Sequence, residues 1–156
     1  MPLKIYIDAD ACPVREETYK VARRHNVEVI VVSNSFIRVP REPGISLQIV
    51  SENFDAADDY IANNVDNMSI TITSDILLAE RCLKTDGLVI APNGKSFTKD
   101  SIGGAIATRA IMADLRAGAD MPNIGGPKPF SSKDRSNFLN TLHVKIEKLK
   151  RDLNQL

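Results

Sequence analysis

The fold is indicated by residues 3–13, which read LKIYIDADACP. A short apolar run rich in β-branched side chains ends at Asp8, which is the pattern of a buried strand. Pro13 then suits the first turn of a helix, where its missing N–H costs little. The stretch therefore predicts a strand, a loop that carries two carboxylates, and a helix.

The same alternation of strand and helix signals continues to residue 91. Apolar runs predict further strands over 27–32, 45–50, 68–73 and 88–91. Helices are expected between them, including 56–65 and 76–85, with Asp55 as a plausible N-cap of the first of these two. Alternating strands and helices predict a parallel sheet with helices on both faces, and we expect the strand order 3-2-1-4-5.

The last third of the chain adds helices to this core. Asn93-Gly94 predicts a turn, and Asp100 or Ser101 can cap a helix that runs to about residue 117. A loop rich in Gly and Pro covers 118–131, and a helix with one apolar stripe is expected over about 132–153. The prediction is one α/β domain over residues 1–156, doubly wound, with a core over 3–117 and extra C-terminal helices.

Composition excludes several classes of protein. The chain has 156 residues with 20 basic and 20 acidic side chains, and 43% of its residues are hydrophobic, which argues against intrinsic disorder. Its apolar runs are too short for a membrane span or a signal peptide, so a cytoplasmic protein without a membrane partner is expected. Charge is uneven, since residues 1–100 carry 11 basic and 15 acidic side chains and residues 101–156 carry 9 and 5.

Carboxylates follow the predicted strands where a parallel sheet places its ligands. Asp8 ends the first strand and Asp75 follows the fourth, so in the expected order they face each other across one crevice. Asp10 and Asp58 are expected nearby. Carboxylates gathered in a cleft repel one another, and a divalent cation removes that conflict. Oxygen ligands without histidine favour Mg²⁺ or Mn²⁺. We expect Asp8, Asp10, Asp58 and Asp75 to bind the metal and Asp8 and Asp75 to be catalytic, although strand-end Asp residues also serve as plain caps.

Basic residues of the C-terminal half are the candidates for holding phosphate groups. Arg109 and Arg116 are seven residues apart, on one face of a predicted helix, and a solvated helix face is the plain alternative. Lys128 and Arg135 flank Gly125 and Gly126, whose backbone N–H groups can cradle a phosphate, although a simple connecting loop fits equally well.

Other reactive side chains give weaker signals. Cys12 lies beside the acidic residues and just before a helix, but no histidine is near it in sequence, so a catalytic thiol is not favoured. His143 lies near the apolar stripe of the last helix and is interpreted as a packing or surface residue. No cofactor other than the metal is expected.

Five segments in order resemble the YaiI/YqxD family of uncharacterised bacterial proteins. They are residues 5–14 (IYIDADACPV), 55–61 (DAADDYI), 73–79 (TSDILLA), 125–130 (GGPKPF) and 134–138 (DRSNF). Leu77 departs from the expected family pattern, which has Pro there, and the Gly103-Gly104 pair is unusual. That family is similar to PIN-like domains, which are metal-dependent nucleases that act mostly on RNA. The resemblance implies a PIN-like fold with a metal site made by Asp8, an acid among residues 55–59, and Asp75.

The leading hypothesis is therefore a metal-dependent phosphodiesterase in which metal-activated water attacks phosphorus. Nucleic acid is the expected partner, with RNA favoured through the resemblance alone, and homodimer formation stays open. One alternative is a phosphatase of the haloacid-dehalogenase type, with Asp8 as nucleophile and Asp10 as acid. Another is a non-catalytic domain that binds RNA or protein.

Overall fold

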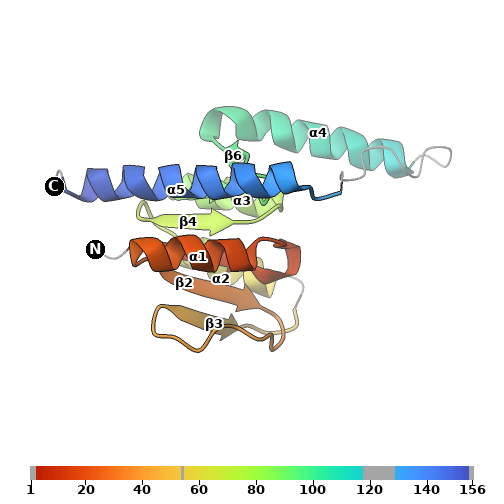
Figure 1. Cartoon of the computed structure of the whole chain (residues 1–156). Helices are drawn as coiled ribbons and strands as arrows, with labels where there is room; N and C mark the ends of the chain where they lie inside the picture. Colours follow the sequence, from red (N-terminus) through yellow and green to blue (C-terminus); the bar gives the residue numbers. More distant parts are fainter. Residues whose placement is uncertain (1–2, 54, 118–128, 155–156) are drawn as a thin grey trace.

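A six-stranded sheet forms the centre of the computed structural model, which describes residues 3–53, 55–117 and 129–154 (Figure 1). The strands are β1 (Lys4–Asp8), β2 (Glu28–Ser33), β3 (Ile45–Ile49), β4 (Ser69–Ile72), β5 (Leu88–Ile90) and β6 (Ser96–Phe97). Their order is β3-β2-β1-β4-β5-β6, so the expected order of the first five is confirmed. These five are parallel, and β6 pairs antiparallel with β5.

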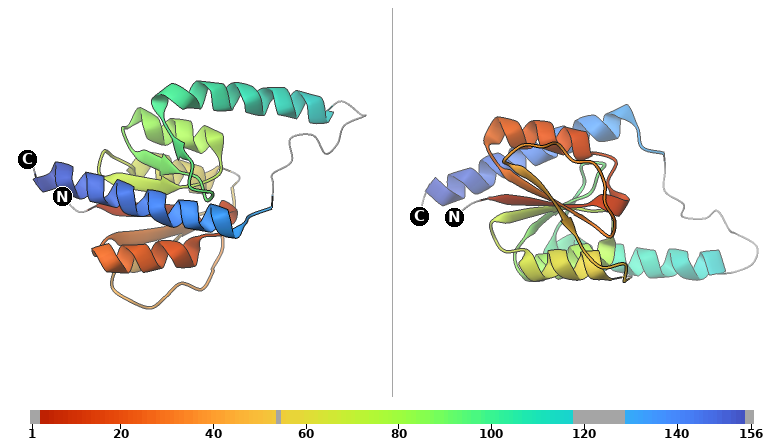
Figure 2. Two further views of the ribbon diagram at one scale, coloured as in Figure 1. Left: turned by 45° about the horizontal axis from the view of Figure 1, so that its top comes forward. Right: turned by 90° about the horizontal axis from the view of Figure 1, so that it is seen from below.

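Helices cover both faces of the sheet. They are α1 (Arg15–His25), α2 (Ala56–Asn64), α3 (Ile76–Lys84), α4 (Lys99–Ala117) and α5 (Ser132–Asn154), with a short 3₁₀ turn, η1 (Ala9–Ala11), after β1. Figure 2 shows α1 and α5 on one face and α2 and α3 on the other, and α4 packs against α3. The molecule is thus the doubly wound α/β domain that the strand pattern predicts. Among the described residues, no helix is both long and apolar enough to cross a membrane.

Alternation along the strands divides the core between the two faces. In β1, Ile5 and Ile7 pack with α1 and α5, whereas Tyr6 packs with α2 and α3. Asp8 follows the same alternation as Tyr6, because successive strand side chains point to opposite faces. The carboxylate at the end of β1 is therefore directed to the face that α2 and α3 cover.

Two local predictions differ from the structure. Helix α1 begins at Arg15 rather than at Pro13, because η1 occupies the start of the connection and Val14 is the N-cap residue. Asp55 does stand at the N-cap position of α2, but its side chain makes no capping hydrogen bond. The first turn of α2 is instead closed by a backbone bond, in which the N–H of Asp59 donates to the carbonyl of Asp55 at 2.8 Å.

The Asn93-Gly94 turn is confirmed and has a packing role. Gly94 has a φ of +89°, and a Cβ there would lie 2.5 Å from the backbone of Asn137 on α5. The Thr141 hydroxyl of the same helix donates to the carbonyl of Gly94 at 2.8 Å. This turn therefore fits closely against α5 while it leads into β6, a two-residue strand that the sequence did not predict.

Candidate functional site

Thr73 links the ends of the two central strands. Its hydroxyl donates to Oδ2 of Asp8 at 2.9 Å and accepts the backbone N–H of Asp75 at 3.0 Å. Thr73 directly follows β4, which is the neighbour of β1 in the sheet, so one side chain spans the gap between the strands. The arrangement fixes the Asp8 carboxylate, whose residue is only 6% exposed, against the loop that carries Asp75.

Asp75 has two structural partners and lies where the sequence predicts it. It is the N-cap of α3, and its Oδ1 accepts the backbone N–H groups of Leu77 and Leu78 at 3.0 and 3.2 Å. This is the usual role of Asp at a helix start. The capping bonds hold one carboxylate oxygen, so the orientation of the whole group is fixed at the carboxyl edge of the sheet.

Asp58 completes a group of three interacting carboxylates, Asp8, Asp58 and Asp75, which we call the acidic cluster. Burial, and then the negative charges of Asp75, Asp8 and Asp55, raise the pKa of Asp58 to about 6. A side-chain hydrogen bond with Asp75 adds to this shift, and it needs a proton on Asp58 because two carboxylates have none to share. Above about pH 6 this proton is lost, so at neutral pH the three carboxylates of the metal-free cluster repel one another.

Asp8 experiences the same repulsion. Burial raises the pKa of Asp8, and the negative charges of Asp10 and Asp75 raise it further, while the Thr73 hydrogen bond works in the opposite direction. Asp10 is exposed in η1, and so it acts on Asp8 from the solvent side of the loop.

The donor set of the acidic cluster fits a hard divalent cation held loosely. It offers only oxygen atoms, which suits Mg²⁺ or Mn²⁺. Within the described parts of the chain, the only three ligand side chains whose ligand atoms all lie within 4.8 Å of one another are elsewhere, at His25, His143 and Glu147. The acidic cluster is thus more open than a closed cage, in keeping with Mg²⁺ sites that use one or two carboxylates, several waters and substrate phosphates.

A cleft of about 680 Å³ opens beside Asp75, whose two chain neighbours Ser74 and Ile76 line it. Its other lining residues come from the end of β5, the turn, β6 and α4. They are Ala91, Asn93, Lys95, Phe97, Ser101, Gly104, Ala105, Thr108, Arg109 and Met112. The cleft thus brings two cationic side chains, Lys95 and Arg109, next to the chain neighbours of Asp75, whereas Asp8, Asp58 and Asp75 themselves do not line it.

The remaining predicted phosphate ligands are placed differently. Arg135 lies 3.3 Å from Glu17 of α1, and its guanidinium stands 5.4 Å from the ring centre of Phe130. It joins α5 to α1 and is not among the residues that line the cleft. Gly125, Gly126 and Lys128 lie outside the described residues, as does the side chain of Arg116.

Cys12 does not have the environment of a reactive thiol. It is buried, and burial raises its pKa to about 12, which leaves the thiol protonated at neutral pH. Because the thiolate is the nucleophilic form, this environment does not favour a catalytic thiol at Cys12, in line with the sequence analysis.

Sequence reasoning missed Thr73, the residue on which the geometry of the cluster depends. The available signal was the alternation of strand residues, which places Thr71 and Thr73 on the same face of the sheet as Tyr6 and Asp8. Alternation alone did not reveal the hydrogen bond between Thr73 and Asp8, because a Thr at the end of a strand is common in any sheet.

Comparison with protein families identifies the chain. The family model described as "Uncharacterized BCR, YaiI/YqxD family" matches residues 6–148. The chain belongs to the YaiI/YqxD family. A "UPF0178 protein" of Sphingopyxis alaskensis is 58% identical over 149 residues, which cover 96% of both chains. Another of Azorhizobium caulinodans is 50% identical over 150 residues, or 96% of this chain and 93% of the relative. No solved structure matches the chain.

Proposed function

We propose that this YaiI/YqxD protein is a metal-dependent phosphodiesterase that cleaves nucleic acid, with RNA as the favoured substrate. The observation that carries the proposal is the acidic cluster, where the Asp58 pKa is raised to about 6 by burial and by the neighbouring carboxylates. Perturbed carboxylates gathered beside a cleft are typical of functional sites. Asp8 ends β1 and Asp75 follows β4, at the carboxyl ends of adjacent parallel strands, which is where doubly wound domains bind their ligands.

The roles of the residues follow from their positions. Asp8 and Asp75 have their orientations fixed by hydrogen bonds, so they are the anchoring metal ligands, and Asp58 and Asp10 complete the set. When bound there, Mg²⁺ or Mn²⁺ supplies positive charge that lowers the pKa of water and stabilises a phosphoryl transition state. The raised pKa of Asp58 marks the place where a cation would relieve the repulsion among the carboxylates.

The cleft provides the complementary charge for substrate. Lys95 and Arg109 come from its two sides, β6 with its turn and α4, and can neutralise successive phosphates. The preference for RNA rests on the resemblance of the family to PIN-like nucleases. The chain has few aromatic side chains, 5% of its residues and no Trp, so recognition by base stacking contributes little.

A nuclease assay with a double variant tests the proposal. Purified protein is mixed with structured or unstructured RNA in Mn²⁺, Mg²⁺ or EDTA, and Asp8→Asn, Asp75→Asn protein is run alongside. Asn is the matched replacement at both sites, because it still accepts a hydrogen bond from Thr73 and still caps a helix. We expect cleavage that requires metal and falls at least about a hundredfold in the folded double variant.

The alternatives predict other results. Equal cleavage by the double variant would mean that the acidic cluster is not the site. The phosphatase would be favoured if RNA is not cleaved but a phosphomonoester is hydrolysed, and if a phosphoaspartate is trapped at Asp8. RNA binding that persists in EDTA and in the double variant, without cleavage, would favour a binding domain.

A further inference from the structure

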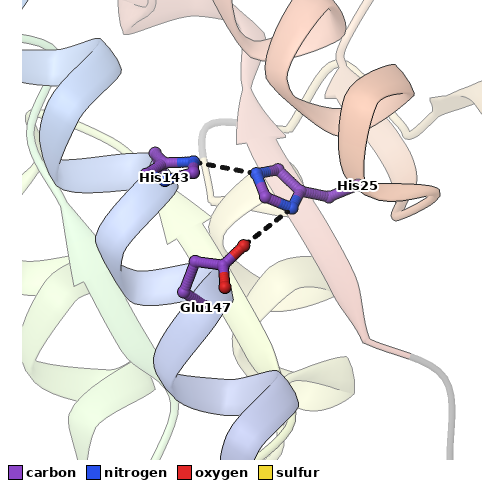
Figure 3. A group of neighbouring side chains, drawn as sticks. All are labelled: His25, His143 and Glu147. Carbon is purple, nitrogen blue, oxygen red and sulfur yellow. Dashed lines mark hydrogen bonds and ion pairs between the residues drawn. The ribbon is translucent and has the colours of Figure 1, made fainter.

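The two histidines of the chain meet far from the acidic cluster. The sequence contains only His25 and His143, yet Nε2 of His25 lies 2.9 Å from Nδ1 of His143 (Figure 3). His25 ends α1, and β2 begins three residues later, so the pair lies toward the edge where the strands start. Asp8 and Asp75 lie at the opposite edge. The histidine contact therefore has no part in the proposed phosphodiesterase site.

Glu147 adds a carboxylate to the pair. It follows His143 by four residues on α5, which places both side chains on one face of that helix. Its Oε1 lies 3.3 Å from Nδ1 of His25, and one ligand atom from each of the three residues lies within 4.8 Å of the others. Glu147 and the histidine pair thus form a chain in which the carboxylate orients His25 and His25 faces His143 (Figure 3).

The surroundings keep this cluster in the form that binds metals. Burial, and then the positive charge of Lys150, lower the pKa of His25, so its ring is neutral at physiological pH. A neutral imidazole is the metal-binding form. The Lys150 ammonium itself is held by the backbone carbonyl of His25, and Arg24 is the other nearby cation that a bound metal would face.

We propose that His25, His143 and Glu147 form a binding site for Zn²⁺ or a similar late first-row divalent cation. Nε2 of His25 and Nδ1 of His143 would supply two ring nitrogens of the kind that zinc prefers, Glu147 would hold the His25 ring through its other nitrogen, and water would complete the coordination. Two nitrogens that each lie about 2.05 Å from a tetrahedral zinc are about 3.3 Å apart. The observed 2.9 Å is the separation of nitrogens that share a proton, so the metal replaces that proton with a small opening of the pair.

The site would fasten α5 to the core. Arg135 of α5 contacts Glu17 of α1, and eight residues further along both helices His143 contacts His25. The two helices therefore run side by side in the same direction, with a charged contact near their beginnings and the histidine cluster near the end of α1. A metal bound there stabilises the folded chain by mass action, because the unfolded chain has no preformed site.

Metal titration of the full-length, chelator-treated protein tests this inference. Binding of Zn²⁺ is measured by calorimetry, and Co²⁺ is used as a probe whose visible absorption reports tetrahedral nitrogen and oxygen ligands. The variants are His143→Ala and Glu147→Gln, neither of which replaces a fully buried side chain, with Asn140→Ala as an exposed control on the same helix. The Asp8→Asn, Asp75→Asn protein separates this site from the acidic cluster.

We expect one Zn²⁺ per chain, a raised Tm, and an intense Co²⁺ spectrum in the wild type, in Asn140→Ala and in the double Asp variant. His143→Ala should lose all three signals, and Glu147→Gln should bind about 10- to 100-fold more weakly. The inference is overturned if the wild type gives no saturable Zn²⁺ binding, or if His143→Ala binds as the wild type does. It is equally overturned if the double Asp variant loses the signals while His143→Ala keeps them.

Discussion

At the scale of single residues, Thr73 is the most informative position, because one hydroxyl serves both strand ends. Replacing it by Val keeps the shape but leaves Oδ2 of Asp8 and the N–H of Asp75 without their partner. We expect a loss of about 1–3 kcal/mol in the free energy of unfolding, measured in urea. We also expect roughly 10- to 100-fold weaker Mn²⁺ binding, because Thr73 orients the ligands.

Thr73→Ser is the matched control for this change. It keeps the hydroxyl and removes one buried methyl group, which costs about 1 kcal/mol. Mn²⁺ affinity should then stay near that of the wild type. Equal losses of affinity in the Val and Ser variants would show that packing, and not the hydrogen bonds, orients the carboxylates.

Asp58 contributes less to the stability of the metal-free protein at neutral pH than in mild acid. Its pKa is about 6 in the folded chain against 3.8 for an unperturbed Asp side chain, so the folded state binds the proton more tightly. The stabilisation that comes from this proton is therefore fully present below about pH 4 and is lost as the pH rises through 6. Asp58→Asn removes this loss, and we expect it to raise the free energy of unfolding by about 1 kcal/mol at pH 7.5, after allowance for solvent screening.

Urea titrations in EDTA at pH 4.5 and pH 7.5 measure this effect. The gain from Asp58→Asn should fall to about a third at the lower pH, because most of the loss accrues between pH 4.5 and pH 6. Asp59→Asn is the control, because Asp59 is the exposed neighbour and pairs with Arg81 at 2.9 Å. If Asp58→Asn gave the same change at both pH values, burial of the side chain rather than its charge would be responsible.

The sequence indicated Asp8, Asp58 and Asp75 because they lie at the ends of predictable elements. Strand order then placed Asp8 and Asp75 side by side, and this is how the structure has them. His25 and His143 could not be paired in this way, because their contact depends on how α5 lies along α1. Arg135 was a phosphate candidate by its neighbours in sequence, whereas the structure engages it with Glu17.

At the scale of elements, the turn between β5 and β6 depends on Gly94. Its φ of +89° is unfavourable for any side chain, and a Cβ would collide with the backbone of Asn137. Gly94→Ala should cost at least about 2 kcal/mol in unfolding free energy. Because Lys95 follows this turn into the cleft, the same change should weaken RNA binding in the protein that remains folded.

Gly44→Ala is the comparison for that variant. Nothing lies within 4 Å of a Cβ at Gly44, and its φ is not in the left-handed range. The substitution should be neutral or stabilise the protein by up to about 1 kcal/mol, because Ala restricts the unfolded chain. A similar cost at both glycines would show that the contact with α5 does not constrain the turn.

Long, strongly patterned elements were predictable, and short ones were not. The five parallel strands follow from their apolar runs, and α5 from its stripe of Phe138, Leu142, Ile146 and Leu149, all buried. Strand β6 has two residues, too few for any alternation to appear. The start of α1 differed because η1 takes up the residues after Asp8, a choice set by the loop around the carboxylate rather than by helix propensity.

At the scale of the whole molecule, the fold brings the acidic N-terminal part of the chain and the basic C-terminal part onto neighbouring elements. The acidic cluster belongs to the N-terminal part, whereas Arg109 of α4 comes from the basic C-terminal part. The two lie on neighbouring elements, because α4 packs on α3, the helix that Asp75 caps. A neutral overall charge is therefore compatible with a local site for an anionic polymer.

Neutralising the two cationic side chains of the cleft tests this arrangement. Lys95→Gln and Arg109→Gln should each weaken RNA binding, and each should reduce the dependence of log affinity on log salt by about 0.7, the value for one phosphate contact with a single strand. Both residues are exposed, so the Tm should hardly change. Arg151→Gln, an exposed change on the last turn of α5, is the control and should keep the wild-type slope. If all three variants lowered the slope equally, RNA would be held by diffuse charge over the surface, and the cleft would not be its path to the acidic cluster.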